Sequence, residues 1–231
     1  MRIKPAIHEI YHIYNRGVEK RRVFLDNTDR ERFIQSLFLF NDQSPTFNNH
    51  LKKWPSFEVR LQIEKEKMVE IMAFVLMPNH FHLMLRGVVE NGVTEFMRKL
   101  GTGYTNYFNT KYKRVGALFQ GKFKAALVKE QRHFMYLPYY IHLNPLDLID
   151  KKWREQRLST NKRAGRFLES YKWSSYLDYI GKENFSEILS MDFLSEFFES
   201  PAKHKKNMLE WISEKNLETI SDIALEPVGE A

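Results

Sequence analysis

The alternation of apolar and polar residues along the chain follows two different periods, and these predict its secondary structure. A period of two, or a short continuous apolar run, is typical of strands. Strands are therefore expected over four segments: 8–15, 69–76, 80–86 and 119–128. Apolar residues three and four positions apart are typical of amphipathic helices. Helices are expected over 30–40, from Thr94 to Arg114, and over 130–144.

The order of these elements predicts the fold class. Strand, helix, strand, strand, helix and strand follow one another, and a further helix comes after the last strand. This order is typical of a ferredoxin-like α+β fold, an antiparallel sheet with helices on one face. The polar and charged stretch at about 41–68 contains Pro45 and Pro55, and we interpret it as a loop insertion.

A change of composition after about residue 150 predicts two parts. The first part, residues 1–150, holds the strands and helices described above. The second part, 151–231, begins with a basic, apolar-poor stretch that reaches Arg166 and continues with an aromatic patch at 171–176. Helices are expected there over 185–198 and 201–215. We interpret this part as a basic linker and a C-terminal helical extension with an acidic tail.

The third predicted strand carries a pair of histidines on one face. Side chains alternate along a strand, so His80 and His82 point the same way and Phe81 points the other way. Pro78 cannot donate to a central ladder, and with Asn79 it marks the turn before the strand. Two imidazoles placed like this are within reach of one small cation, which predicts half of a metal site. The alternative is that both histidines are satisfied by hydrogen bonds in the core.

A second polar pair lies in the helix that ends before Pro145. Tyr140 and Asn144 are four residues apart and therefore face the same side of the helix. An asparagine carbonyl oxygen is an acceptable third ligand for a hard divalent cation, and a tyrosine beside it could be a covalent nucleophile. Tyr139 differs from Tyr140 by about 100° of rotation, so we expect it to pack elsewhere. Taken alone, the segment also fits an ordinary aromatic helix core.

Composition limits the class of protein and its partners. The chain has 231 residues, of which 43% are hydrophobic and 28% charged, as in an ordinary folded protein. It contains no cysteine, which excludes disulfides and thiolate metal sites and suits a reducing compartment. The net charge of +7 suggests a polyanionic partner without choosing between DNA, RNA and a membrane surface. No apolar run reaches membrane-spanning length and no signal peptide is evident, so we expect a cytoplasmic protein outside the membrane.

Several ordered segments of the chain resemble one protein family. They are YHIYNRG at 11–17, FLD at 24–26, DRERF at 29–33, MPNHFH at 77–82, LFQGKFK at 118–124, YIHLNP at 140–145 and WSSY at 173–176. Together they resemble the REP-associated tyrosine transposases, the single-tyrosine branch of the HUH nucleases with an IS200-like transposase domain. The resemblance runs over most of the chain, and it implies a transposase catalytic domain in residues 1–150.

The resemblance implies a metal-dependent single-stranded DNA endonuclease and strand transferase. His80, His82 and Asn144 are expected to hold a divalent metal, Mg²⁺ or Mn²⁺, and Tyr140 to attack a phosphodiester. The attack leaves a 5′-phosphotyrosine link and a free 3′-OH, and the 3′-OH can later reverse the reaction on another DNA end without ATP. Imidazole and oxygen ligands suit Mn²⁺, whereas cellular availability favours Mg²⁺.

DNA contacts are expected at polar and basic residues near these segments. They are Arg16, Arg114, Gln120, Lys122 and Lys124. Interleaved tyrosine and phenylalanine rings can stack on unpaired bases, although the ordinary alternative for any one lysine is a solvated charged surface. The expected partner is single-stranded DNA with hairpins, and the protein is expected to act as a monomer or a homodimer.

Two departures from the family pattern and two alternative functions accompany this interpretation. Pro138 can kink the helix that aims Tyr140, and Asp147 stands where relatives usually carry a basic residue.

One alternative function is a non-catalytic DNA-binding regulator at repeat hairpins on the same fold. The presence of the tyrosine and all three predicted ligands speaks against it. The other is a relative of replication initiators or relaxases, and the YIHLNP and WSSY segments favour the transposase branch instead.

Overall fold

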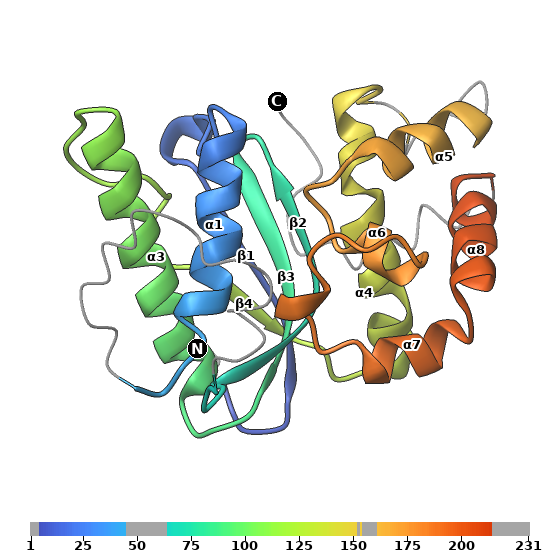
Figure 1. Ribbon diagram of the computed structural model, residues 1–231, viewed down its shortest axis with the longest axis horizontal. Helices are drawn as coiled ribbons and strands as arrows, with labels where there is room; N and C mark the ends of the chain where they lie inside the picture. Colours follow the sequence, from blue (N-terminus) through green and yellow to red (C-terminus); the bar gives the residue numbers. More distant parts are fainter. Residues whose placement is uncertain (1–4, 45–63, 152, 154–160, 214–231) are drawn as a thin grey trace.

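A four-stranded antiparallel sheet forms the centre of the protein (Figure 1). The computed structural model describes residues 5–44, 64–151, 153 and 161–213. The strands are β1 (Ile10–Arg16), β2 (Val69–Met77), β3 (His80–Gly87) and β4 (Lys124–Leu127). They lie in the order β2-β3-β1-β4, with every neighbouring pair antiparallel. This arrangement confirms the predicted ferredoxin-like α+β fold.

Two helices that connect strands cover one face of the sheet (Figure 1). They are α1 (Asn27–Leu39) and α3 (Gly92–Lys111). The Phe33 ring of α1 packs against Phe81 of β3, with 5.0 Å between the ring centroids. Asp26 and Asp29 form a capping box at the start of α1, and the Lys111 ammonium at the end of α3 lies 2.8 and 2.7 Å from their carboxylates. Apolar packing and this ion cluster therefore hold the two helices together.

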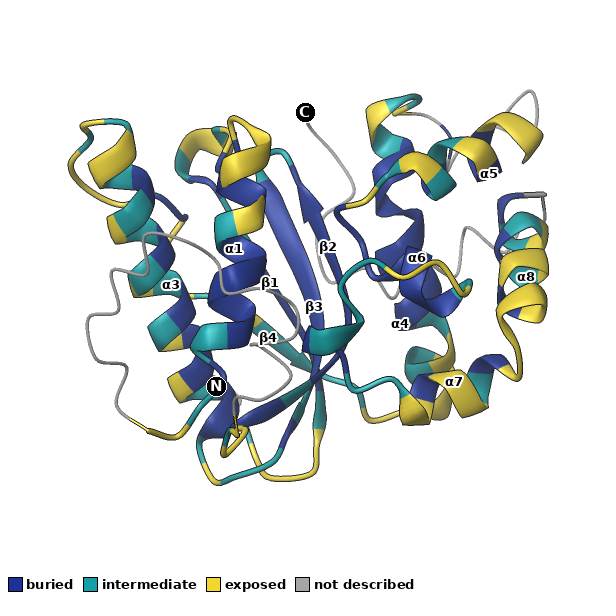
Figure 2. Ribbon diagram, in the orientation of Figure 1, coloured by how far each residue is buried: buried dark blue, intermediate teal, exposed yellow. Residues whose placement is uncertain are grey.

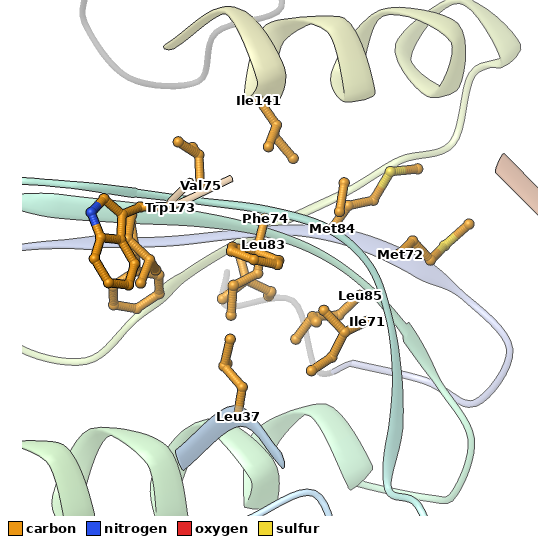
Figure 3. Packing of buried hydrophobic residues seen from close by; sticks show 14 of the residues in the cluster. Leu37, Ile71, Met72, Phe74, Val75, Leu83, Met84, Leu85, Ile141 and Trp173 are labelled. Atoms are coloured by element: carbon orange, nitrogen blue, oxygen red, sulfur yellow. The ribbon is translucent and has the colours of Figure 1, made fainter. Parts of the chain in front are cut away.

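The opposite face of the sheet is covered by α4 (Gln131–Leu143). Figure 3 shows Leu37 of α1 on one side of the sheet and Ile141 of α4 on the other, with Val75 and Met84 turned toward Ile141. The expectation of helices on one face thus holds for α1 and α3, whereas α4 lies on the second face. Apolar side chains on both faces of β2 and β3 explain the difference, because each face needs a cover. Pro138 lies inside α4 and does not end it.

Some element boundaries differ from the sequence expectations. The helix expected from Thr94 begins at Gly92, and Asn91 precedes it in a left-handed conformation. The strand expected over 119–128 is confined to β4, and Phe119 only forms an isolated bridge with Gly17. Most of the expected insertion, half of the basic linker and the whole acidic tail lie outside the described residues.

The C-terminal helices lie on the α4 side of the sheet (Figure 1). They are α5 (Asn161–Ser170), α6 (Tyr176–Tyr179), α7 (Asp192–Phe198) and α8 (Pro201–Ser213). Three short 3₁₀ segments are Val18–Lys20, Asn144–Leu148 and Ser186–Ile188. Figure 2 shows buried residues concentrated in the sheet and on the helix sides that face inward. The division near residue 150 stays a prediction, and residues from both sides of it share one apolar core. None of the described helices is long and apolar enough to cross a membrane.

The WSSY segment covers the outer edge of β2. The Leu76 amide donates to the Trp173 carbonyl at 2.9 Å, and the Ser175 amide donates to the Phe74 carbonyl at 3.0 Å. The Phe74 amide in turn donates to the Ser175 hydroxyl at 2.9 Å. Uncovered strand edges can pair with other chains. The segment therefore closes one edge of the sheet and anchors the C-terminal helices to it.

A buried chain of polar groups continues from Ser175 through α4 to α8. The Ser175 hydroxyl lies 2.9 Å from Nε2 of His142, and Nδ1 of His142 lies 3.2 Å from Nε2 of His204. The His204 ring stacks on Phe198 at 3.6 Å between centroids. Burial lowers the pKa of His204 to about 3. Burial, and then the neighbouring His204, holds the pKa of His142 well below its ordinary value. Both imidazoles are therefore neutral in the folded protein at neutral pH.

We predict that these histidines make the protein less stable as the pH falls. The His204 side chain takes up a proton near pH 6.5 when unfolded but only near pH 3 when folded. The unfolded state therefore binds more protons within this window, and each such histidine lowers the free energy of unfolding by up to about 1.4 kcal/mol per pH unit. Urea denaturation between pH 7 and 5 measures the slope.

The His204→Phe variant separates this contribution from the others. It should show a shallower decline of unfolding free energy with falling pH than the wild type. The His8→Gln variant is the matched control and should keep the wild-type slope, because His8 is exposed. Identical slopes for wild type and His204→Phe would show that His204 does not supply the pH dependence.

Candidate active site

The pairing of β1 with β3 places the predicted histidines beside residues of β1. Tyr14 pairs with His82, and Arg16 pairs with His80. Residues directly opposite in an antiparallel pair project to the same face of the sheet. Val75 of β2 pairs with His82 as well, and Figure 3 places Val75 on the α4 side. All these side chains therefore share the face that α4 covers, and His80 and His82 lie together as the alternation predicted.

The start of β3 is held by a tight turn against the end of β1. The Gly17 amide donates to the Asn79 carbonyl at 2.8 Å, and the Val23 amide donates to the Pro78 carbonyl at 2.9 Å. A Cβ at Gly17 would come within 2.2 Å of the Arg21 carbonyl oxygen, so the tight loop that follows β1 requires glycine at this position. The turn thus fixes the backbone immediately before the first histidine.

A third histidine joins the cluster, and the sequence analysis gave it no role. His12 of β1 is buried, and its Nε2 lies 2.8 Å from Nδ1 of His82. The two rings are stacked with 5.1 Å between centroids. Burial lowers the pKa of His12 to about 3, so the ring is neutral at neutral pH. The alternation of residues 8–15 was a usable signal, because it places His12 and Tyr14 on one face of β1. The register with β3 was not available from the sequence.

Tyr140 of α4 stands over this histidine cluster. Its ring centroid lies 5.3 Å from that of His82 and 5.7 Å from that of His12, edge-on to both. Tyr139 points toward α8, where it stacks on Trp211 at 4.8 Å between centroids. Its hydroxyl accepts a hydrogen bond from the Asn207 amide nitrogen at 3.2 Å. The helix rotation therefore brings Tyr140 to the histidines and turns Tyr139 away.

Asn144 lies one turn after Tyr140, at the end of α4. It is buried, and its Nδ2 donates to the Tyr140 carbonyl at 2.9 Å. This bond uses the amide nitrogen and leaves the carbonyl oxygen of the side chain as the acceptor. Within the described ranges, no three His, Cys, Asp or Glu side chains are grouped so that they could hold a metal ion. An oxygen from Asn144 beside His80 and His82 would give a mixed N,O donor set, which fits a divalent cation such as Mn²⁺.

The expected DNA contacts divide into two groups, one beside β1 and one, Arg114, beside α3. Lys124 of β4 pairs with Tyr14, and its ammonium lies 5.5 Å from the Tyr14 ring centroid. The Gln120 amide donates to the Arg16 carbonyl at 2.9 Å, which holds the loop after Phe119 against the end of β1. The exposed side chains of this group are Gln120, Lys122 and Lys124. They lie on the strand and the loop beside β1, close to the histidine face.

Arg114 lies in the other layer of the protein. Its Nη1 donates to the Asn109 side chain at 3.0 Å, and its guanidinium carbon lies 5.7 Å from the Phe108 ring centroid. Phe108 is a buried residue of α3, on the face opposite the histidines. The structure therefore does not bring Arg114 together with the histidine cluster, because α3 packs on the Phe81 face.

Asp147, which departs from the family pattern, has a structural partner. The indole nitrogen of Trp153 donates to its carboxylate at 2.6 Å. Trp153 is among the largest fully buried side chains, and a buried indole N–H needs an acceptor. The acidic residue therefore fixes the chain after α4 within the core.

The arrangement offers three kinds of chemistry in one place. The imidazoles of His80 and His82 lie next to each other, and the Tyr140 ring lies next to His82. Asn144, one helical turn after Tyr140, offers an amide oxygen as a possible third ligand of a divalent cation. Exposed lysines border the same sheet face and can attract an anionic chain. A cation and a phenol at a site that attracts an anionic chain suit nucleophilic attack on a phosphate ester.

Comparisons with known proteins give the following results. The family described as "Transposase IS200 like" matches residues 10–144. A solved structure of a REP-associated tyrosine transposase bound to a REP hairpin is similar, with 13% sequence identity and a TM-score of 0.47. The similarity covers 83% of this chain and 91% of that chain. No curated protein matches the sequence.

Proposed function

The chain belongs to the IS200-like transposase family, and from this premise we propose that it is a metal-dependent single-stranded DNA endonuclease and strand transferase. The observation that carries the proposal is the position of Tyr140, whose ring lies 5.3 Å from His82 on the same sheet face as His80. A nucleophile beside two potential metal ligands is what a phosphodiester transfer requires.

His80, His82 and Asn144 are the residues that would hold the metal. The hydrogen bond from Nδ2 of Asn144 to the Tyr140 carbonyl supports this, because it engages the amide nitrogen and so orients the amide, whose oxygen is the atom that could bind a cation. The sequence resemblance to metal-dependent relatives supports Mg²⁺ or Mn²⁺. When bound, the ion would neutralise charge on the scissile phosphate and align it with the attacking oxygen.

Tyr140 carries the covalent step. Its hydroxyl oxygen attacks the phosphorus and loses its proton, and the bond from phosphorus to the 3′ oxygen breaks. The 3′ oxygen takes up a proton and leaves as a free 3′-OH, while the 5′ phosphate stays on the tyrosine. In the reverse direction, the 3′-OH of another DNA end attacks the phosphotyrosine and restores the phenol. The bond energy is conserved in the link, so strand transfer needs no ATP.

The DNA strand would cross the β1–β4 side of the histidine face. Arg16, Gln120, Lys122 and Lys124 are the proposed contacts, and Lys124 pairs with Tyr14 of β1 on the histidine face. We leave Arg114 out of this path because its contacts are in the α3 layer. The sequence resemblance to the REP-associated branch supports a single strand with a hairpin as the substrate, a cytoplasmic place of action, and a monomer or homodimer as the active form.

The second candidate function is a DNA-binding regulator on the same fold without catalysis. Such a regulator would retain the DNA contacts at Lys122 and Lys124 but would not form a covalent product. The location of Tyr140 and both histidines in one cluster favours the enzyme, and a covalent adduct separates the two functions directly.

We predict that Tyr140→Phe eliminates the covalent protein–DNA adduct and retains DNA binding. The substitution removes only the attacking oxygen and keeps the ring beside His82. Tyr139→Phe is the matched control, since Tyr139 packs on Trp211 and should not reach the phosphate. Labelled hairpin-bearing single strands incubated with Mn²⁺ and run on a denaturing gel measure the adduct, and EDTA should abolish it. An adduct that persists in Tyr140→Phe and disappears in Tyr139→Phe would reverse the assignment.

We also predict that Lys124 contributes a phosphate contact. Binding of single-stranded DNA should weaken with salt, and Lys124→Ala should reduce the slope of log K against log salt by about 0.7, the value for one contact. Arg114→Ala is the comparison in the opposite layer and should leave the slope unchanged. Fluorescence anisotropy over a salt series gives both slopes. A loss of slope in Arg114→Ala but not in Lys124→Ala would place the DNA on the other face.

A further inference from the structure

His12 makes a polar contact that the proposed reaction does not yet use. It lies on the central part of β1, and its Nε2 is 2.8 Å from Nδ1 of His82. Both rings are buried, with exposed fractions of 3% and 0%. A neutral imidazole has one donor nitrogen and one acceptor nitrogen. The contact therefore requires one ring to donate and the other to accept, and it couples the proton positions of the two histidines.

The tautomer of His80, the other proposed ligand, follows from a hydrogen bond of its own Nδ1. Nδ1 of His80 lies 2.7 Å from Oδ1 of Asn79. An amide oxygen only accepts hydrogen bonds, so Nδ1 of His80 carries the proton. The nitrogen that His80 can offer to a cation is therefore Nε2. The residue just before the ligand fixes its tautomer.

We propose that His12 is the positioning residue for His82, accepting a hydrogen bond from Nδ1–H of His82 so that this ring presents Nε2 to the metal. The proposal rests on the function proposed above, in which His82 is a ligand. It makes the two ligands alike, since His80 and His82 would each donate from Nδ1 and coordinate through Nε2. His12 would carry its own proton on Nδ1. A metal-bound histidine commonly donates its other N–H to an acceptor such as a carboxylate, a backbone carbonyl or water, which orients the ring and makes it a better ligand. Here the acceptor would be the Nε2 atom of His12.

The geometry favours this role over a place for His12 among the ligands. Its Nε2 faces Nδ1 of His82, which is the ring nitrogen opposite the one that would bind the ion. Along the described part of the chain, no three His, Cys, Asp or Glu side chains converge so that they could hold a metal ion, and His12, His80 and His82 are therefore not three ligands of one ion. His12 therefore acts on the cation through His82. The edge-on contact of His12 with Tyr140, at 5.7 Å between centroids, places the same ring against the nucleophile as well.

Two variants test the proposal. His12→Phe keeps a planar ring but cannot accept a hydrogen bond, whereas the side-chain carbonyl of His12→Gln can. We expect Mn²⁺ affinity, measured by electron paramagnetic resonance, to fall by about 10- to 100-fold in His12→Phe, and to be restored to near the wild-type value in His12→Gln. Circular dichroism and thermal unfolding establish that each variant is folded. Equal Mn²⁺ affinity in wild type and folded His12→Phe would overturn the proposal.

A second measurement needs neither metal nor variant. Proton–nitrogen correlation spectra of the metal-free protein with ¹⁵N-labelled histidine report the tautomer of each ring. We expect His82 to be protonated on Nδ1 in the wild type, and a His82 protonated on Nε2 would overturn the proposal. If the wild type binds no Mn²⁺ but shows the expected tautomer, the metal-dependent function fails while the hydrogen-bond assignment stands. If it binds Mn²⁺ and His12→Phe binds equally well, only the role of His12 fails.

Discussion

The register between β1 and β3 decides which side chains meet beneath α4. It pairs Tyr14 with His82 and Arg16 with His80, and it brings His12 within hydrogen-bonding distance of His82. A slip of one residue would turn the imidazoles of β3 toward the apolar layer of α1 and α3 and turn Phe81 toward α4. The packing of Phe81 on Phe33 opposes such a slip, because the aromatic core on that face would be lost. The packing that stabilises the α1 and α3 side of the sheet therefore also fixes which side chains meet on the α4 side.

The helix that carries Tyr140, α4, is held from both sides. On its inner side, Tyr140 meets His82 and His12. On its outer side, Tyr139 packs against Trp211, and His142 joins Ser175 and His204 in a buried polar chain. Each of these contacts would be lost if α4 rotated. Pro138 removes a backbone donor from the helix, yet contacts on both sides maintain its direction. The C-terminal helices therefore act on the site by fixing the rotation of α4.

Part of this site could be predicted from local sequence patterns and part could not. The strand alternation was sufficient to place His80 and His82 together, and the four-residue spacing was sufficient to select Tyr140 over Tyr139. The contact of His12 with His82 depends on strand register, and the cover that Ser175 gives to β2 joins residues 101 positions apart. Neither leaves a local signal. Arg114 was expected among the DNA contacts because it is basic and close in sequence to the family segments, and only the packing on Phe108 assigns it to the α3 layer. The α+β plan followed from element order, while the position of α4 on the second face depended on which apolar faces remained to be covered.

The proposed function requires that His80, His82 and Asn144 form a single cation site beside Tyr140. Anomalous diffraction from crystals of the protein soaked in Mn²⁺ tests it most directly, because the signal locates the ion independently of any activity. We expect one strong peak at coordination distance from Nε2 of both histidines and from Oδ1 of Asn144, next to the Tyr140 hydroxyl. A peak elsewhere on the protein, with none between these residues, would contradict it.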